Sequence, residues 1–215
     1  MKWKITIGVE DFTTDDVARC ARALKEGEIG IIPTDTVYGI AALASEEEAV
    51  ARVMEIKGRP PGKPLPVQAS SLADVSRIAA ADDPVASALA NEYWPGPLTL
   101  ILPRRGGAVL PFQDEKSVGV RVPDSAFARE LLAAAGFLVV PSANPAGAPP
   151  PVEVSDIAGE IIAAVDFVVD AGACKGGIES TVVRVVGATR VLRTGAIPEE
   201  DLLRVVRRAM GEERG

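Results

Sequence analysis

Residues 136–150 read GFLVVPSANPAGAPP, and this stretch indicates the type of fold. The apolar run GFLVV is typical of a short buried strand. The segment that follows offers the side chains of Ser142 and Asn144 and contains no acid, base or thiol. It is either a plain loop or a site that presents hydroxyl, amide and backbone groups to a ligand. The surrounding sequence distinguishes these two interpretations.

Strands and helices alternate on both sides of this stretch, with proline and glycine between them. Helices are predicted at 13–27, 45–58, 71–80, 84–91, 125–136, 156–165 and 198–210. Strands are predicted at 28–33, 65–67, 98–102, 118–122, 137–140, 166–170, 180–186 and 190–193, the last two as a hairpin. This order is typical of an α/β protein with a mixed sheet. We expect a single domain over 1–215, with a tail at about 209–215.

Helix ends are predicted from capping residues. Thr14 is the expected N-cap of the first helix, and Ser125 that of the helix at 125–136. Ser45 and Glu48 have the spacing of a capping box.

The composition excludes several classes of protein. The chain has 215 residues, of which 47% are hydrophobic, so it can form a large core. No apolar run approaches the ~20 residues of a membrane helix, and the N-terminus lacks a signal-peptide pattern, so we expect a soluble cytoplasmic protein. The net charge of −7 argues against nonspecific nucleic-acid binding but allows a local basic groove.

The chain contains no histidine and only two cysteines, Cys20 and Cys174. This excludes Ser-His-Asp and Cys-His catalysis, histidine bases, histidine metal sites and a structural zinc site. Any catalysis must then use lysine, arginine, carboxylates, hydroxyls, backbone amides or a metal that a ligand brings. We interpret both cysteines as ordinary reduced thiols.

Several polar segments adjoin predicted strands, where open α/β sheets bind ligands. They supply cations and neutral donors suited to an anion, together with glycines that allow close backbone approach. The cations are Lys57, Arg59, Lys63, Arg121 and Arg193, and the neutral donors are Thr34, Thr36, Ser142, Asn144, Ser180 and Thr181. Arg121 is the sharpest signal, because a charge within an apolar strand is costly unless it is paired.

Each segment also has a purely structural interpretation. Arg121 could face solvent or pair with an internal acid, and Lys57 and Arg59 could be a solvated helix end. The segment 33–39 could be the entry to a helix, with Tyr38 as a core aromatic. Arg193 could be a surface charge, and residues 93–97, YWPGP, are best interpreted as a rigid packed turn.

Taken together, the motifs PTDTVYGI, KGR, WPGPLTLIL, VGVRVP, PSAN, ESTVV and LRTGAI resemble, in this order, the YrdC family of threonylcarbamoyl-AMP synthases. The resemblance runs from about Glu28 to Ile197. It implies a twisted mixed sheet flanked by helices around a basic concave cavity. It also implies a nucleotidyltransferase that joins L-threonine, bicarbonate and ATP into threonylcarbamoyl-AMP and pyrophosphate. A separate transferase would then modify tRNA, Mg²⁺ would arrive with ATP, and weak tRNA binding could coexist with catalysis.

The resemblance also implies roles for individual residues. Lys57 and Arg59 are the expected catalytic pair. The expected threonine contacts are Thr36, Gln68, Arg121, Val140 (through its backbone) and Ser180. The expected nucleotide contacts are Lys57, Arg59, Lys63, Ser117, Ser142, Asn144 and Arg193.

Three positions depart from the family pattern. Gln68 stands where many members have histidine, so it can form hydrogen bonds but cannot act as a base. Residues 149–151 are Pro-Pro-Pro where Ser-Pro-Thr is common, and Lys63 stands where Asn is common. The longer members have a linker and a second domain, which we expect this chain to lack.

Two alternative functions remain. One is an RNA-binding module that uses the same cavity without catalysis, although the 4% aromatic content argues against base stacking. The other is a carbamoyl-adenylating domain that acts on a substrate other than threonine.

Overall fold

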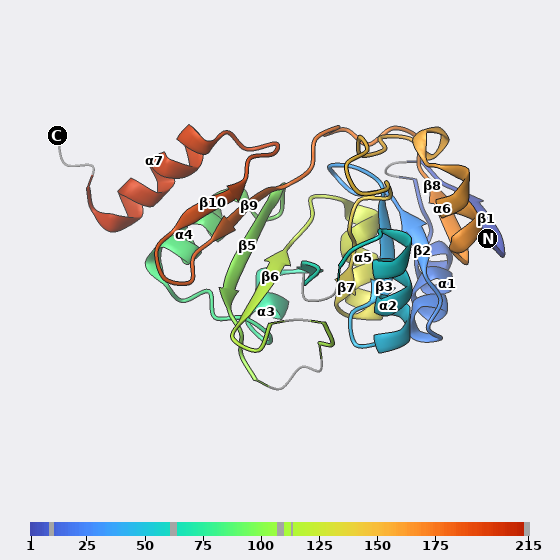
Figure 1. The fold of residues 1–215 in the computed structure, drawn as a ribbon, viewed down its shortest axis with the longest axis horizontal. Coiled ribbons are helices and arrows are strands. Elements are labelled where there is room, and N and C mark those ends of the chain that lie inside the picture. The colour runs from blue at the N-terminus through green and yellow to red at the C-terminus, as the bar shows by residue number, and fades with distance from the viewer. Residues whose placement is uncertain (9–10, 61–63, 107–109, 113, 213–215) are drawn as a thin grey trace.

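The computed structural model describes residues 1–8, 11–60, 64–106, 110–112 and 114–212, and Figure 1 shows their arrangement. In this part of the chain, ten strands form one sheet in the order β1-β8-β2-β3-β7-β4-β6-β5-β9-β10. The strands are β1 (Trp3–Thr6), β2 (Gly30–Ile32), β3 (Gly39–Leu43), β4 (Val67–Gln68), β5 (Leu98–Pro103), β6 (Ser117–Arg121), β7 (Leu138–Val139), β8 (Phe167–Asp170), β9 (Thr181–Arg184) and β10 (Arg190–Arg193). Parallel pairs such as β4–β6 and antiparallel pairs such as β5–β6 both occur, which confirms the predicted mixed sheet.

Helices cover the sheet on both faces and at one end. They are α1 (Thr14–Lys25), α2 (Glu47–Ile56), α3 (Leu72–Val75), α4 (Pro84–Tyr93), α5 (Ala126–Ala135), α6 (Gly159–Ala164) and α7 (Glu199–Met210), with a 3₁₀ turn at Val154–Asp156. In Figure 1, α4 and α7 lie beside β9 and β10, and α1 and α6 lie near β1 and β8. Residues 209–210, expected in the tail, belong to α7.

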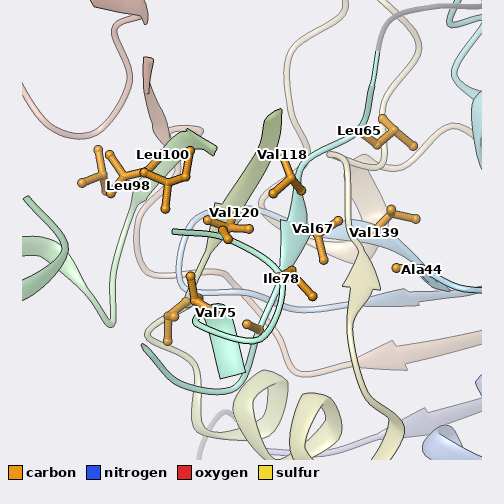
Figure 2. Close-up of a cluster of buried hydrophobic side chains, with 14 of the residues drawn as sticks. Ala44, Leu65, Val67, Val75, Ile78, Leu98, Leu100, Val118, Val120 and Val139 are labelled. Carbon is orange, nitrogen blue, oxygen red and sulfur yellow. The ribbon is translucent and has the colours of Figure 1, made fainter. Parts of the chain in front are cut away.

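Two apolar cores form because successive side chains of a strand point to opposite faces. Ile31 and Ile40 pack in the core that includes α2, whereas Ile32 and Ala41 pack in the core that includes α1 and α5. The first core continues across β4, β5, β6 and β7, where Figure 2 shows the apolar side chains of these strands beside Val75 and Ile78.

Two strands were not predicted. The edge strand β1 is short, and Trp3 attaches it by stacking on Phe167 of β8, with ring centroids 4.6 Å apart. The strand β3, GIAAL, is rich in small residues that have little intrinsic strand preference. It forms because it lies between β2 and β7, where space is limited: a Cβ on Gly39 would lie 2.5 Å from Val140 Cγ1.

Several predicted helix starts are wrong by one or two residues. Thr13, not Thr14, caps α1, because its side chain accepts from the backbone N–H of Asp16 and the Asp16 carboxylate accepts in return. The capping box of Ser45 and Glu48 does not form, since α2 begins at Glu47 and its N-cap, Glu46, makes no side-chain capping bond. Ser125 caps α5 as predicted.

The helix predicted at 71–80 is confined to Leu72–Val75. Both cysteines are free thiols, as predicted. Burial raises the pKa of Cys20 to about 12 and that of Cys174 to about 11, which keeps both protonated at neutral pH. In the described residues, no helix is both long enough and apolar enough to span a membrane.

Candidate functional site

A cavity of about 590 Å³ lies where the polar segments meet. It is lined by parts of the segments 34–39, 57–68, 140–148 and 179–193, together with side chains of β5 and β6. The predicted site residues that line it are Thr36, Lys57, Arg59, Gln68, Arg121, Val140, Ser142, Asn144, Ser180 and Arg193. The fold therefore gathers these separate motifs around one space.

Of the residues with a predicted substrate contact, two are not placed in this lining. The candidate donor Thr181 is outside it as well, and its hydroxyl donates to Ile197 O at 2.8 Å. Ser117 begins β6, at the opposite end of the strand from Arg121, and its hydroxyl contacts Asp114 at 3.4 Å. Lys63 lies outside the described residues. The nucleotide-binding roles of both stay predictions.

The charges of the described lining residues are strongly unequal. Lys57, Arg59, Arg121 and Arg193 contribute four cationic side chains, and Glu179 contributes the one carboxylate. Such a surface favours an anionic ligand.

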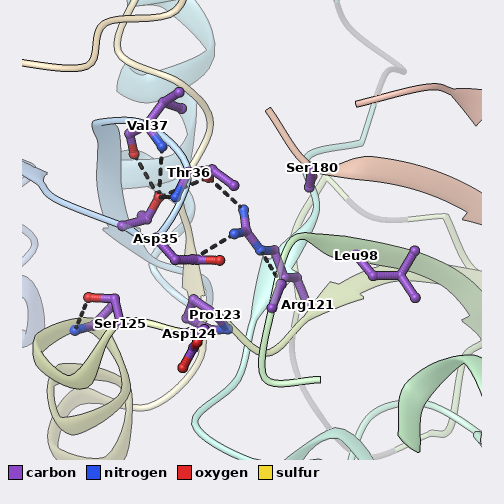
Figure 3. A network of polar contacts seen from close by, with 12 residues as sticks. Asp35, Thr36, Val37, Leu98, Arg121, Pro123, Asp124, Ser125 and Ser180 are labelled. Atoms are coloured by element: carbon purple, nitrogen blue, oxygen red, sulfur yellow. Dashed lines mark hydrogen bonds and ion pairs between the residues drawn. The ribbon is translucent and has the colours of Figure 1, made fainter. Parts of the chain in front are cut away.

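Arg121 is buried inside the sheet, with 5% of its surface exposed. Its Nε donates to Gly96 O at 3.0 Å, Nη1 to Thr36 Oγ1 at 3.0 Å and Nη2 to Asp35 Oδ1 at 2.6 Å (Figure 3). Burial lowers the pKa of the guanidinium, and the Asp35 carboxylate opposes that shift. Of the two structural interpretations, exposure to solvent is wrong and pairing with an internal acid is correct.

This pairing leaves Arg121 able to bind a ligand. Each terminal nitrogen of a guanidinium carries two hydrogens, and one on each is used by Thr36 and Asp35. The second hydrogen on each nitrogen is left over by these two bonds, and a guanidinium can bind a carboxylate through such hydrogens. Asp35 thus holds the guanidinium without consuming its binding capacity.

The turn at 33–37 presents Thr36 to the cavity. Thr34 Oγ1 accepts from the backbone N–H groups of Thr36 and Val37 and donates to Val37 O at 2.7 Å. This closed turn is followed by β3, so the interpretation as a helix entry is wrong. Tyr38 is a buried core aromatic, in agreement with its structural interpretation, and its hydroxyl donates to Gly172 O at 2.7 Å.

A second loop, which contains Gly176 and Gly177, forms hydrogen bonds to the backbone of this turn. The backbone N–H groups of Gly176 and Gly177 donate to the carbonyls of Asp35 and Thr36 at 3.0 and 2.9 Å. A Cβ on Gly176 would lie 2.7 Å from Asp35 O, so only glycine fits there without a shift of the backbone.

Lys57 connects the end of α2 to the loop of the opening motif. Its Nζ donates to Ser142 O and Asn144 O, both at 2.6 Å, and to Asn144 Oδ1 at 2.8 Å. Burial lowers the pKa of Lys57 to about 8, while the charge of Glu179 opposes this shift. Lys57 is therefore not a solvated helix end.

The loop 141–148 is a structured wall of the cavity. Ser142 Oγ donates to Glu179 Oε1 at 2.9 Å, and Asn144 Nδ2 donates to Ala148 O at 2.5 Å. The plain-turn interpretation is wrong for this segment, because it is held by Lys57 and lines the cavity.

Two arginines complete the same side of the cavity. Arg59 Nη2 donates to Pro64 O at 2.7 Å, and burial lowers the pKa of its guanidinium. Arg193 Nη1 contacts Glu179 Oε2 at 3.0 Å, and Nη2 donates to Ser180 O at 2.9 Å. Arg193 is partly exposed but belongs to the cavity lining and is not an isolated surface charge.

Neutral polar groups line the rest of the cavity. Ser180 Oγ lies 2.9 Å from Thr99 Oγ1 and accepts from Arg193 Nη2 at 3.3 Å. Gln68 pairs in register with Arg121 across β4 and β6, so the two side chains share one face of the sheet. Gln68 is 4% exposed, and its Oε1 has no hydrogen-bond partner among the described residues. A buried acceptor without a partner is rare, and its explanations include a catalytic role or a bound water or ion.

The sequence did not single out three of these groups: Asp35, Thr99 and Glu179. Asp35 and Glu179 each directly precede a predicted site residue, and that adjacency was the available signal. The 93–97 turn is packed, as predicted, since Trp94 Nε1 donates to Leu98 O at 2.7 Å.

A model of the Sua5–YciO–YrdC family, described as "Telomere recombination", matches residues 22–195. The chain therefore belongs to this family, and its twisted mixed sheet with flanking helices is the YrdC-like fold.

Named relatives share the fold and much of the sequence. The chain is 33% identical over 210 residues to the threonylcarbamoyl-AMP synthase of Bacillus subtilis. This alignment covers 95% of this chain and 61% of that protein. It is 35% identical over 147 residues to the threonylcarbamoyl-AMP synthase of Chromohalobacter salexigens, covering 67% and 80% of the two chains. The structure of Pyrococcus abyssi Sua5 complexed with L-threonine matches with a TM-score of 0.86 and 32% identity, covering 94% of this chain and 60% of that chain. The chain thus spans roughly three fifths of the Bacillus and Pyrococcus relatives.

Proposed function

We propose that this protein is a threonylcarbamoyl-AMP synthase. It would convert L-threonine, bicarbonate and ATP into threonylcarbamoyl-AMP and pyrophosphate, and a separate transferase would pass the threonylcarbamoyl group to tRNA. The observation that carries the proposal is the single cavity, which combines a buried arginine and buried hydroxyls with three further cations. Relatives named for this activity support it.

We assign the threonine side to the buried polar groups. The second hydrogens of the Arg121 guanidinium would hold the threonine carboxylate, and Thr36 or Ser180 would bond the threonine hydroxyl. Gln68 Oε1, which has no partner among the residues that the structure describes, would accept a hydrogen of the amine. A site that bonds a hydroxyl rejects analogues lacking it, because its own polar groups are then left unpaired. These contacts would favour threonine over other amino acids.

We assign the nucleotide side to Lys57, Arg59, Ser142, Asn144 and Arg193. The three donors of Lys57 hold the loop, so its main contribution would be to fix Ser142 and Asn144 and to supply positive charge near the phosphates. Arg59 and Arg193 would contact phosphate oxygens directly.

The chemistry has two steps that need no nucleophile from the protein. The threonine amine, in its deprotonated form, attacks the carbon of bicarbonate, and loss of water leaves an N-carboxylate. A carboxylate oxygen then attacks the α-phosphorus of ATP, and the bond to the β-phosphate oxygen breaks to release pyrophosphate. Both steps gain mainly from positioning and from neutralisation of charge.

Magnesium is expected to arrive with ATP. The described residues include no group of three or more Cys, Asp or Glu side chains that could enclose a metal ion. A cavity with four cations and one carboxylate suits Mg²⁺ held mainly by phosphates and water. When bound, the metal would screen the charge of the triphosphate.

The proposal is tested by measuring pyrophosphate release from ATP with Mg²⁺, bicarbonate and L-threonine, omitting one component at a time. Release that requires both threonine and bicarbonate is the expected result. Release with a different amine would keep the chemistry and change the substrate. Failure to bind ATP would contradict the enzyme and favour a binding module.

A further inference from the structure

Glu179 differs from every other charged residue in the described cavity lining, because it is the one with a negative charge. It directly precedes β9, and its side chain is 33% exposed. A carboxylate in this position is unexpected, since an anionic ligand in the cavity would be repelled by it.

The contacts of Glu179 place it on the nucleotide side. Oε1 accepts from Ser142 Oγ at 2.9 Å, and Oε2 contacts Arg193 Nη1 at 3.0 Å. Its charge also acts on Lys57, whose pKa it raises against the effect of burial. The carboxylate is thus surrounded by the groups that we assign to the phosphates of ATP.

These contacts leave coordination capacity on the carboxylate. Each carboxylate oxygen has two lone-pair directions, and the bonds from Ser142 and Arg193 use one on each oxygen. Fixed by Ser142 and Arg193, the group could accept a cation without changing its position.

We infer that Glu179 is the protein ligand of the Mg²⁺ that accompanies ATP, bound directly or through one metal-bound water. This inference rests on the proposed function. A metal between Glu179 and the phosphates would turn the repulsion into attraction. Mg²⁺ at nucleotide sites typically binds phosphates together with one or two carboxylates, and Glu179 is the described lining residue able to supply one.

The test compares the wild-type protein with Glu179→Gln, which removes the charge at nearly constant size. Calorimetry would measure the affinity for ATP with Mg²⁺ and with EDTA. The wild-type protein should bind Mg²⁺-bound ATP about tenfold or more tightly than metal-free ATP. Substitutions at metal sites change metal affinity by a similar factor. The variant should bind metal-free ATP more tightly than wild type and Mg²⁺-bound ATP more weakly, so that the preference disappears.

A second measurement follows the metal itself. Electron paramagnetic resonance would measure the affinity of Mn²⁺ for the protein–ATP complex, and Glu179→Gln should weaken it about tenfold. Glu179→Asp, which keeps the charge, should retain part of the metal preference. The matched control is Glu48→Gln, an exposed glutamate on α2 outside the cavity lining, which should behave as wild type.

Two outcomes would overturn the inference while leaving the proposed function intact. One is an unchanged metal preference in Glu179→Gln. The other is an equal gain of affinity for metal-free and Mg²⁺-bound ATP in the variant. That result would mean that Glu179 only competes with the phosphates for the surrounding cations. If the wild-type protein binds neither form, the proposed function fails and this inference fails with it.

Discussion

The two sides of the cavity are built in different ways. On the side assigned to threonine, Thr36, Gln68, Arg121 and Ser180 are 2%, 4%, 5% and 6% exposed. Gln68 and Arg121 lie on strands, Thr36 lies in a closed turn, and Ser180 directly precedes β9. On the side assigned to the nucleotide, Asn144 is 9% exposed, whereas Lys57, Ser142 and Arg193 are less buried and come from a helix end, a loop and an edge strand. Under these assignments, the small substrate is recognised mainly by buried groups fixed within the sheet, and the larger anion mainly by groups at its rim.

The largest effect is expected from Arg121→Ala. The substitution leaves Asp35 without its cation in a mostly buried position, which should reduce the free energy of unfolding by about 3 kcal/mol. Threonine binding should be lost as well. Chemical denaturation measures the first effect and calorimetry with threonine the second.

The double variant Arg121→Ala/Asp35→Ala is the control for this prediction. It should recover part of the lost stability and none of the threonine binding. A single Arg121→Ala variant as stable as wild type would show that the buried pair is not a structural element of the threonine side.

A pH effect is expected on the nucleotide side. The pKa of Lys57 is lowered to about 8, so its positive charge is present below that pH and is lost as the pH rises through it. ATP affinity should therefore decrease above about pH 8. Calorimetry with ATP at several pH values measures this affinity directly. Threonine is left out, so the titration of its amine does not affect the result.

The variant Lys57→Arg tests whether Lys57, and not another titrating group, causes the decrease in ATP affinity. Arginine keeps its charge over the accessible pH range, so the decrease above pH 8 should disappear in the variant. A decrease of equal size in Lys57→Arg would assign it to another group.

A smaller, selective effect is expected from Asp35→Asn. The amide keeps the size of the side chain but loses the charge that orients Arg121, so KM for threonine should rise about tenfold, equivalent to roughly 1.4 kcal/mol. KM for ATP should not change. An equal rise in both constants, measured by steady-state kinetics, would contradict a division of the cavity into two independent sides.

The smallest effect is expected from Gln68→Met. Removing a buried acceptor that has no partner in the described part of the chain should increase the free energy of unfolding by about 1 kcal/mol. KM for threonine should nevertheless rise a few-fold, because the amine loses its acceptor. Gain of stability without loss of threonine affinity would show that Gln68 is only part of the packing.

The sequence was most informative where the chemistry of a residue departed from the hydrophobic pattern around it. Arg121 was identified because a charge interrupts an apolar strand, and Ser142 and Asn144 because a polar loop directly follows one. Asp35 was not identified, because an aspartate between two threonines is equally typical of a helix cap. The strand β3 was missed because its small residues are selected by the space between β2 and β7, which no local pattern reports.

The contacts of Lys57 illustrate the same limit. Its position before a glycine indicates a helix end, whereas its bonds reach a loop far along the chain. The choice of Thr13 over Thr14 as the cap of α1 was likewise decided by backbone geometry, since the two side chains are chemically identical.

The contacts between the 33–37 turn and the 171–177 loop have a practical consequence for protein engineering. Gly176 and Gly177 bond the carbonyls of the turn, and the N–H of Ala171 donates to the Tyr38 hydroxyl at 2.9 Å. The two segments therefore form a single module, although most of the chain separates them. A chimera that exchanges only one of the two segments would pair it with a segment from a different protein and put these hydrogen bonds at risk. Any transfer of the threonine side to another protein should therefore include both segments.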